Sequence, residues 1–229
     1  MGGEGPENLK KKRELARRLD AELQKEYGDK VPRRRPDPLP ELVLTVLSQN
    51  TNDVNRDRAF AELKRRFPEW EDVLAAPAPE IEDAIRMGGL ARQKSERIKG
   101  MLAEIKAREG RLDLGRLCRL PRDEALTYLY SFKGVGKKTA AIVLLFCCGV
   151  PVFPVDTHIL RVSRRLGLVP ARADADRAHE IMDELVADEA KYRLHLNLIE
   201  HGRRVCQARK PQCRICCLKR KCPSADQVK

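Results

Sequence analysis

Aromatic side chains are scarce in this chain of 229 residues, at 4% of its composition. Proteins that hold single-stranded nucleic acid by stacking its bases need several such rings on one surface. The sequence also has no apolar run long enough to cross a membrane and no signal peptide. We therefore expect no aromatic stacking platform, no membrane partner and a cytoplasmic, intracellular protein with reduced thiols.

Basic residues outnumber acidic ones, with 46 Lys and Arg against 34 Asp and Glu and a formal charge of +12. Such an excess suits a polyanionic partner, although a solvated basic surface gives the same count. The length allows one large domain or two small ones.

Apolar residues recur at helical spacing along most of the chain, and little strand alternation is present. The sequence therefore predicts an all-α fold. Asp53 is expected to cap one helix and Pro121 to open another. Residues 1–7 are expected to form a tail, and the proline-rich run 31–38 a linker. The expected helices cover residues 9–27, 40–47, 53–67, 79–86, 94–108, 156–166 and 173–186.

A short glycine motif, Gly134-Val135-Gly136-Lys137-Lys138-Thr139, separates two apolar helical runs. The glycines indicate a tight turn, and the first N–H groups of the following helix are available to an anion. Lys133, Lys137 and Lys138 add positive charge there. A Walker loop is excluded, because it needs glycine at Ser131 and Ser or Thr at Lys138. The motif therefore indicates a phosphate-binding hairpin.

Four cysteines near the C-terminus, separated by six, two and five residues, could surround one metal centre. Their spacing leaves an iron–sulfur cluster, a zinc site and disulfides open. Only one pair has the spacing of a zinc knuckle, so the spacing favours iron and sulfur. The four are Cys206, Cys213, Cys216 and Cys222.

The other cysteines have no such pattern. Cys217 offers a competing ligand directly after Cys216. Cys118, Cys147 and Cys148 are expected to be ordinary thiols, the last two in an apolar helix.

A lone acid lies in the element Val155-Asp156-Thr157-His158, ahead of an apolar helical run. Taken alone, Asp156 is most simply a helix N-cap. His158 is expected to be structural or to contact phosphate. Taken alone, the hairpin favours phosphate binding by Lys138 over catalysis.

Together these motifs resemble the helix-hairpin-helix DNA glycosylases of the endonuclease III type. The resemblance rests on the hairpin 132–140, the element 155–158, the Cys-x6-Cys-x2-Cys-x5-Cys tail and the 18 positions from Lys138 to Asp156. It spans residues 38–222. It implies a [4Fe-4S] cluster on the four cysteines, a monomer, and duplex DNA with damaged bases or abasic sites as partner. In a prokaryote the protein would be nucleoid-associated.

The family fold implies two helical domains that flank a DNA-binding cleft. Residues 38–150 would form a six-helix bundle with the hairpin at 121–148. Residues 1–37 would join residues 151–229 in a second domain, whose cluster loop is 206–222.

The resemblance also implies a bifunctional glycosylase and lyase that removes oxidised pyrimidines. Lys138 would attack the sugar C1′, displace the base, and form a Schiff base that allows β-elimination. Asp156 would stabilise the positive charge that develops on the sugar. A free lysine has a pKa of about 10.4, so Lys138 needs desolvation or positive neighbours such as Lys133 and Lys137.

Further residues match DNA contacts of the family. Asn50 and Leu90 would fill the gap left by an extruded base. The chain departs from the commonest family pattern at Asn50, which replaces glutamine, at Ala91, which replaces a larger residue, and at Lys133, which replaces proline. The remaining expected DNA contacts are Gly134, Gly136, Lys137, His158, Arg209 and Lys210.

Three alternatives stay open. An adenine glycosylase would carry an acid where this chain has Thr45, and normally lacks lysine at 138. A glycosylase for thymine or uracil opposite guanine differs in pocket shape, which the motifs do not report. A non-catalytic DNA-binding module would use the hairpin only to hold phosphates.

Overall fold

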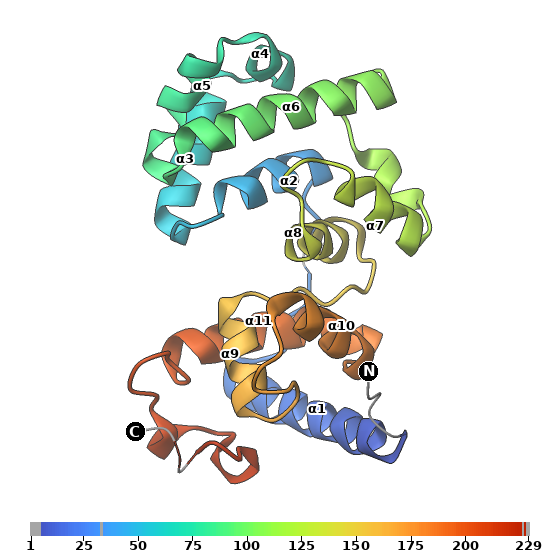
Figure 1. The fold of residues 1–229 in the computed structure, drawn as a ribbon, viewed down its shortest axis with the longest axis vertical. Coiled ribbons are helices and arrows are strands. Elements are labelled where there is room, and N and C mark those ends of the chain that lie inside the picture. Colours follow the sequence, from blue (N-terminus) through green and yellow to red (C-terminus); the bar gives the residue numbers. More distant parts are fainter. Residues whose placement is uncertain (1–5, 33, 226, 228–229) are drawn as a thin grey trace. The chain divides into compact units, whose positions relative to one another are not determined.

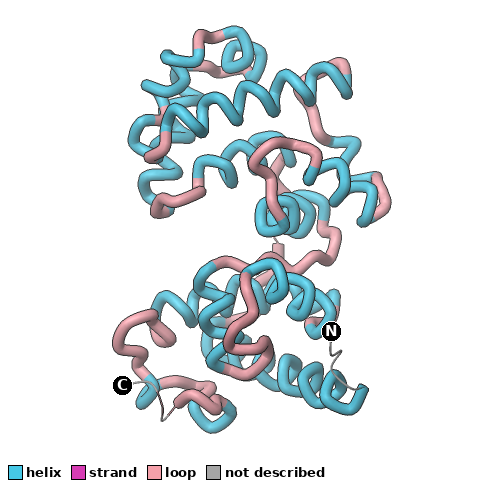
Figure 2. Tube along the Cα trace, viewed as in Figure 1, coloured by secondary structure: helices cyan, strands magenta, loops and turns pink. Residues whose placement is uncertain are grey.

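The computed structural model describes residues 6–32, 34–225 and 227, and within them it contains helices and loops but no strand (Figures 1 and 2). The prediction of an all-α fold is confirmed. Among the described residues, no helix is both long and apolar enough to cross a membrane. The chain divides into two compact units. One covers residues 34–150, and the other combines the N-terminal helix with the chain from Pro151 onward.

The unit of residues 34–150 is built around helix α2 (Pro38–Leu47), which contacts α3, α6, α8 and η3. The apolar sequence of α2 explains its place, since Leu42, Val43 and Leu47 are fully buried. The other elements are α3 (Asp53–Arg66), α4 (Trp70–Ala75), α5 (Ala78–Ala84), η1 (Arg86–Gly88), α6 (Ala91–Glu109), η2 (Gly115–Arg119), α7 (Arg122–Tyr130), α8 (Lys137–Ile142) and the π-helical η3 (Val143–Cys148).

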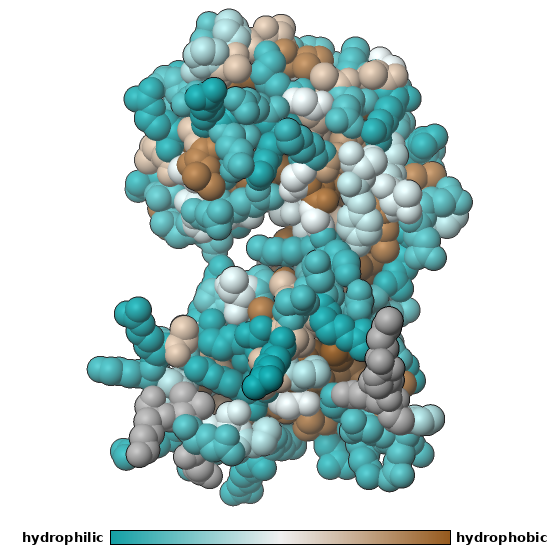
Figure 3. Space-filling model, in the orientation of Figure 1, coloured by the Kyte–Doolittle hydropathy of each residue, from teal (hydrophilic) through white to brown (hydrophobic). Residues whose placement is uncertain are grey.

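The other unit packs α11 (Lys191–Arg204) against α1 (Pro6–Tyr27) and α9 (Thr157–Arg165). Helix α1 contains the helix that the sequence predicted over residues 9–27, and its apolar stripe enters the core of this unit, where Leu19, Leu23 and Tyr27 are buried. The remaining elements are α10 (Ala175–Leu185), η4 (Asp188–Ala190), η5 (Cys213–Ile215) and η6 (Lys219–Lys221). On the face shown in Figure 3, hydrophilic residues predominate in both units.

Several helix ends differ from the prediction. Helix α1 begins at Pro6, so two residues of the expected tail are helical, whereas residues 1–5 lie outside the described part of the chain. The cap of α3 is Asn52 and not Asp53, because the Asn52 side chain accepts the N–H of Asn55 at 2.9 Å. The expected helix 79–86 ends at Ala84 and continues as the tighter η1.

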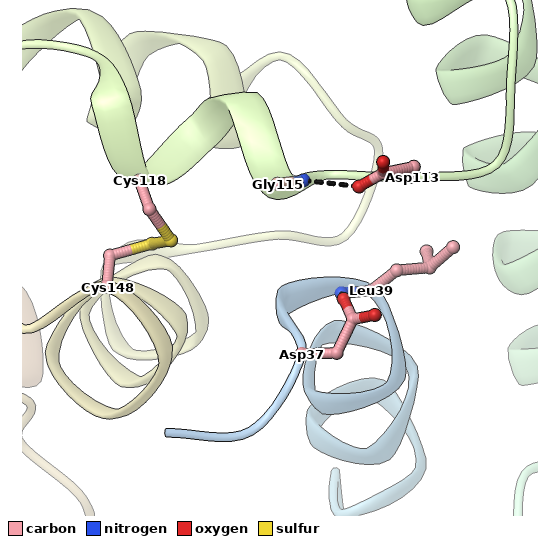
Figure 4. Close-up of a disulfide and its surroundings, with 6 residues drawn as sticks. All are labelled: Asp37, Leu39, Asp113, Gly115, Cys118 and Cys148. Carbon is pink, nitrogen blue, oxygen red and sulfur yellow. Dashed lines mark hydrogen bonds between the residues drawn. A yellow bond between two sulfur atoms is a disulfide. The ribbon is translucent and has the colours of Figure 1, made fainter. Parts of the chain in front are cut away.

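Cys118 and Cys148 were expected to be free thiols, and this is wrong: they form a disulfide (Figure 4). Cys118 lies in η2 before the hairpin, and Cys148 is the last residue of η3 after it. Packing of η2 against η3 brings their Cα atoms to 4.7 Å, within the range that a disulfide spans. The bridge therefore joins the two ends of the helix-hairpin-helix segment. Cys147 remains free and buried.

Candidate nucleic-acid interface and cysteine loop

The glycine motif forms a tight turn between α7 and α8. Gly134 has φ +87°, a conformation that side chains other than glycine rarely adopt. A Cβ atom there would lie 3.0 Å from the Arg97 side chain, which would have to shift by a few tenths of an ångström to admit it. Gly136 caps α8 in an extended conformation, with φ −99°.

Apolar side chains anchor this turn and leave its lysines outside. Phe132 and Val135 are buried, and the Val135 N–H donates to the Phe132 carbonyl at 3.1 Å. Lys133 and Lys138 are exposed, and Lys137 is half-buried. The turn therefore displays cations beside the start of a helix, an arrangement that attracts phosphate.

A side-chain bridge ties the hairpin to α6. Gln49 donates from Nε2 to the Gly134 carbonyl at 3.1 Å, and its Oε1 accepts from Arg97 Nη1 at 2.8 Å. Gln49 directly precedes Asn50, so the Gln49 side chain links the loop after α2 to the hairpin turn. Arg97 was not predicted from the sequence, because a single arginine on a charged helix carries no signal that distinguishes it from its neighbours.

Asn50 and Leu90 are exposed residues in left-handed backbone conformations, with φ +53° and +50°. Asparagine tolerates this region, whereas for leucine it is costly and indicates local strain. Such strain persists where the surrounding structure enforces it, often at functional sites. Leu90 is 51% exposed, and its side chain is therefore available to a partner.

Lys94, which was not predicted from the sequence either, lies beneath these two loops. Its ammonium group donates to the Leu47 carbonyl at 2.7 Å and to the Gly88 carbonyl at 2.8 Å. Burial, and secondarily the charge of Arg97, lowers the pKa of Lys94. A lysine in a helix with many charged residues resembles a surface residue in sequence, and only tertiary packing reveals its burial.

Asp156 lies in the other unit and caps α9, as predicted. Its Oδ1 accepts the N–H of Ile159 at 2.7 Å. Two buried histidines hold the preceding segment: His179 accepts the Val155 N–H at 3.2 Å, and His195 Nδ1 lies 3.0 Å from the Pro154 carbonyl. The carboxylate is half-buried on a fixed backbone.

His158 contacts another side chain of α9. Its Nδ1 lies 3.1 Å from Arg161 Nη2, which also donates to the Gly202 carbonyl at 2.8 Å. Burial lowers the pKa of His158. His158 therefore favours the neutral form at neutral pH, in which it offers a hydrogen bond but no charge.

The four spaced cysteines line one pocket, together with Arg165 and His201 among others. They are free thiols, which removes the disulfide alternative for them. In the part of the chain that the structure describes, no group of three or more His, Cys, Asp or Glu side chains is already arranged as a metal site. The donor set on this pocket is four sulfurs, and four thiolates are the ligands of a [4Fe-4S] cluster.

Polar contacts connect this pocket to the protein around it. Arg165 Nη1 lies 3.3 Å from Cys206 Sγ, and Cys216 Sγ lies 3.6 Å from His201 Nε2. Cys217 is not among the residues that line the pocket, and burial raises the pKa of its thiol to about 11. The four spaced cysteines therefore share one pocket, and Cys217 is not part of its lining.

Arg209 and Lys210 are exposed on the cysteine loop. Arg165 fixes the backbone just before them, since its guanidinium donates to the carbonyls of Gln207 at 2.7 Å and Ala208 at 3.2 Å. Arg209 and Lys210 therefore lie on a loop whose backbone is held by Arg165 of α9.

The structure brings the expected site residues together in two groups. Asn50, Leu90 and the hairpin are connected through α6 within one unit. The cysteines, Arg209 and Lys210 share the cysteine loop of the other unit. Lys138 and Asp156 belong to different units.

Residues 43–188 match the family model of the HhH-GPD superfamily base excision DNA repair proteins. The chain is 33% identical to an endonuclease III of Thermotoga maritima over 88% of this chain and 91% of that protein. It is 34% identical to an endonuclease III of Sulfolobus acidocaldarius over 79% of each. A protein of Arabidopsis thaliana named for DNA glycosylase activity is 44% identical over 71% of this chain, which spans 55% of that relative.

The fold is similar to that of an endonuclease III solved as a non-covalent DNA complex, with a TM-score of 0.80 and 28% identity. The similarity covers 94% of this chain and 97% of the other. A thermostable thymine-DNA glycosylase is similar in fold, with a TM-score of 0.76 and 23% identity.

Proposed function

The chain belongs to the HhH-GPD superfamily of base excision DNA repair proteins, and we propose that it removes oxidised pyrimidines through a Schiff base on Lys138. It is a DNA glycosylase with lyase activity at abasic sites, and its partner is duplex DNA that contains damage. The lesion class is supported by the similarity to proteins named endonuclease III over most of their length. The observation that carries the proposal is the exposed Lys138 in the first turn of α8, on the phosphate-binding hairpin.

The lysine supplies the nucleophile. Uncharged Nζ attacks C1′ of the damaged nucleotide, the C1′–N bond breaks, and the base leaves with the bonding electrons and takes up a proton. Opening of the C1′–O4′ bond, with transfer of a proton from Nζ to O4′, converts this adduct into a protonated Schiff base. The Schiff base acidifies the 2′ hydrogens, and loss of one of them breaks the C3′–O bond, so that the 3′ phosphate leaves with the bonding electrons. Lys133 and Lys137 are sequence neighbours that add positive charge to the same turn.

Asp156 supplies negative charge. The sugar gains positive character as the base departs, and a carboxylate nearby lowers the energy of that transition state. The contact with the Ile159 N–H occupies Oδ1 and fixes the orientation of the carboxyl group.

The four thiolates of Cys206, Cys213, Cys216 and Cys222 are proposed to hold a [4Fe-4S] cluster. When bound, the cluster cross-links the cysteine loop, and no step of the reaction passes through it. A cluster in this role would hold the loop in one conformation, in which Arg209 and Lys210 can contact the DNA backbone.

The remaining assignments concern DNA recognition. Asn50 and Leu90 fill the gap left by the extruded base, and His158 offers a hydrogen bond to phosphate. Gly134 and Gly136 let phosphate approach the hairpin backbone. We propose that residues 34–150 act as the hairpin domain and the other unit as the cluster domain. An enzyme of chromosomal DNA works where that DNA lies, so we propose a cytoplasmic, nucleoid-associated location in a prokaryote.

The lesion class is tested by measuring base release from duplexes that contain a single thymine glycol, a G·T mismatch or a G·U mismatch. We expect release of thymine glycol at a rate well above that of either mismatched base. Faster release from a mismatch would assign the chain to the mismatch glycosylases. DNA binding without release of any base would reduce it to a binding module.

A further inference from the structure

Lys94 is a charged residue in an environment that disfavours charge. It is 1% exposed and lies in α6, within the unit of residues 34–150. A buried ammonium group is costly unless polar partners replace its hydration. Its two carbonyl partners, from Leu47 and Gly88, provide that replacement.

These two carbonyls have a specific place in the chain. Leu47 is the last residue of α2, three residues before Asn50. Gly88 is the last residue of η1, two residues before Leu90. One side chain therefore bonds the base of both loops that carry the expected gap-filling residues.

The backbone of Lys94 adds a third connection, since its N–H donates to the Leu90 carbonyl at 3.0 Å. Space around Gly88 is also restricted, because a Cβ there would lie 3.2 Å from Ala59 Cβ and 4.0 Å from Lys94 Nζ. The loop bearing Leu90 is thus held from two sides while its left-handed backbone presents the leucine outward.

We propose that Lys94 is a positioning residue for base extrusion, which fixes Asn50 and Leu90 relative to each other so that both can enter the base stack together. The proposal rests on the proposed function, which assigns these two residues to the gap. Lys94 itself touches no DNA and acts through the loops. Arg97, one turn later in α6, supports the loop that carries Asn50, because its guanidinium donates to the Gln49 side chain.

A purely structural role for Lys94 makes a different prediction. Loss of stability alone would lower activity on every substrate to the same extent. A positioning role affects duplex substrates, because only these require a nucleotide to be extruded and a gap to be filled. An abasic site in a single-stranded oligonucleotide needs neither.

The test uses Lys94→Met in the full chain, which removes the donors and keeps a long side chain. Single-turnover cleavage is measured on an abasic site in single-stranded DNA, on the same site in a duplex, and on thymine glycol in a duplex. We expect both duplex rates to fall about tenfold to a hundredfold, the scale of a misplacement near 1 Å. The single-stranded rate should stay close to that of the wild type.

Lys99→Met is the matched control, because Lys99 lies in the same helix and donates to the Ala76 carbonyl, away from both loops. It should leave the ratio of duplex to single-stranded rates unchanged. Equal losses on all substrates for Lys94→Met, or no loss on the duplexes, would overturn the proposal. A wild-type protein inactive on thymine glycol would contradict the proposed lesion class, while the two abasic substrates would still test Lys94.

A second perturbation serves if Lys94→Met does not fold. Gly88→Ala displaces one of the two carbonyls and leaves Lys94 in place, and it should lower the same rate ratio. A double-mutant cycle of Lys94→Met with Leu90→Ala adds a further readout, in which each rate loss on duplex DNA is converted to a change in activation free energy. If Lys94 acts through Leu90, the change for the double variant should be smaller than the sum of the changes for the two single variants. Additive losses would contradict the proposal.

Discussion

At the scale of single residues, Asp156 is proposed to combine a structural and a chemical role. Asparagine caps helices about as well as aspartate, so Asp156→Asn should keep α9 capped. The variant loses the negative charge, and we expect single-turnover base release to fall about a hundredfold or more. Thermal unfolding and base release are measured on the same samples, and the unfolding temperature should change little.

Asp174→Asn is the control, because Asp174 caps α10 through the Arg177 N–H at 2.8 Å. It makes the same chemical change at a second N-cap and should retain activity. If Asp156→Asn were equally active, Asp156 would be a cap and nothing more.

The sequence predicted Asp156 as a cap because the pattern of an acid before an apolar helix is local. It did not predict Lys94, Arg97 or the role of Gln49. Their bonds reach the ends of α2 and η1 and the hairpin turn, which are distant in sequence. A single sequence contains no signal for such contacts.

At the scale of elements, the hairpin turn depends on Gly134. Alanine there must adopt φ +87° and place its Cβ 3.0 Å from Arg97, so Gly134→Ala should destabilise the turn by about 1–3 kcal/mol. We expect weaker binding to duplex DNA, measured by fluorescence anisotropy at fixed salt.

Gly136→Ala is the comparison variant. Its φ of −99° suits alanine, and no atom lies within 4 Å of the added Cβ. Its affinity should fall less than that of Gly134→Ala, and the reverse order would show that the Gly134 conformation does not control the turn.

The Cys118–Cys148 bridge closes a segment of 30 positions around the hairpin. Chain-entropy arguments give about 3–4 kcal/mol for a loop of this size. Reduction with dithiothreitol should therefore lower the unfolding temperature of the wild type. A Cys118→Ser, Cys148→Ser variant should unfold at the lower temperature with or without the reductant. An unfolding temperature of the wild type that does not change on reduction would contradict a stabilising role for the disulfide.

Local pattern explains which elements the sequence predicted. The apolar run of α2 and the stripe of α1 appear directly as periodicity. Helix α11 was missed because four of its buried positions are polar, which hides its apolar face; they are Lys191, His195, Asn197 and His201. The disulfide was missed because nothing in the spacing of Cys118 and Cys148 shows that η2 packs on η3.

At the scale of the whole molecule, the charge of +12 governs affinity for DNA. Each phosphate neutralised by a cation contributes about −0.9 to the slope of log affinity against log salt. Four cations besides the nucleophile Lys138, namely Lys133 and Lys137 of the hairpin and Arg209 and Lys210 of the cysteine loop, should therefore give a steep slope of about −4. Titration of duplex binding against potassium chloride measures it, and a slope near zero would show that these cations do not meet phosphate.

The proposed reaction depends on a Schiff base between Lys138 and damaged DNA. The direct test is incubation of the protein with borohydride and a duplex that contains one thymine glycol, with Lys138→Ala and Lys133→Ala in parallel at saturating DNA. We predict a covalent adduct for the wild type and for Lys133→Ala, and none for Lys138→Ala. An adduct that persists without Lys138, or no adduct for a wild type that releases the base, would contradict it.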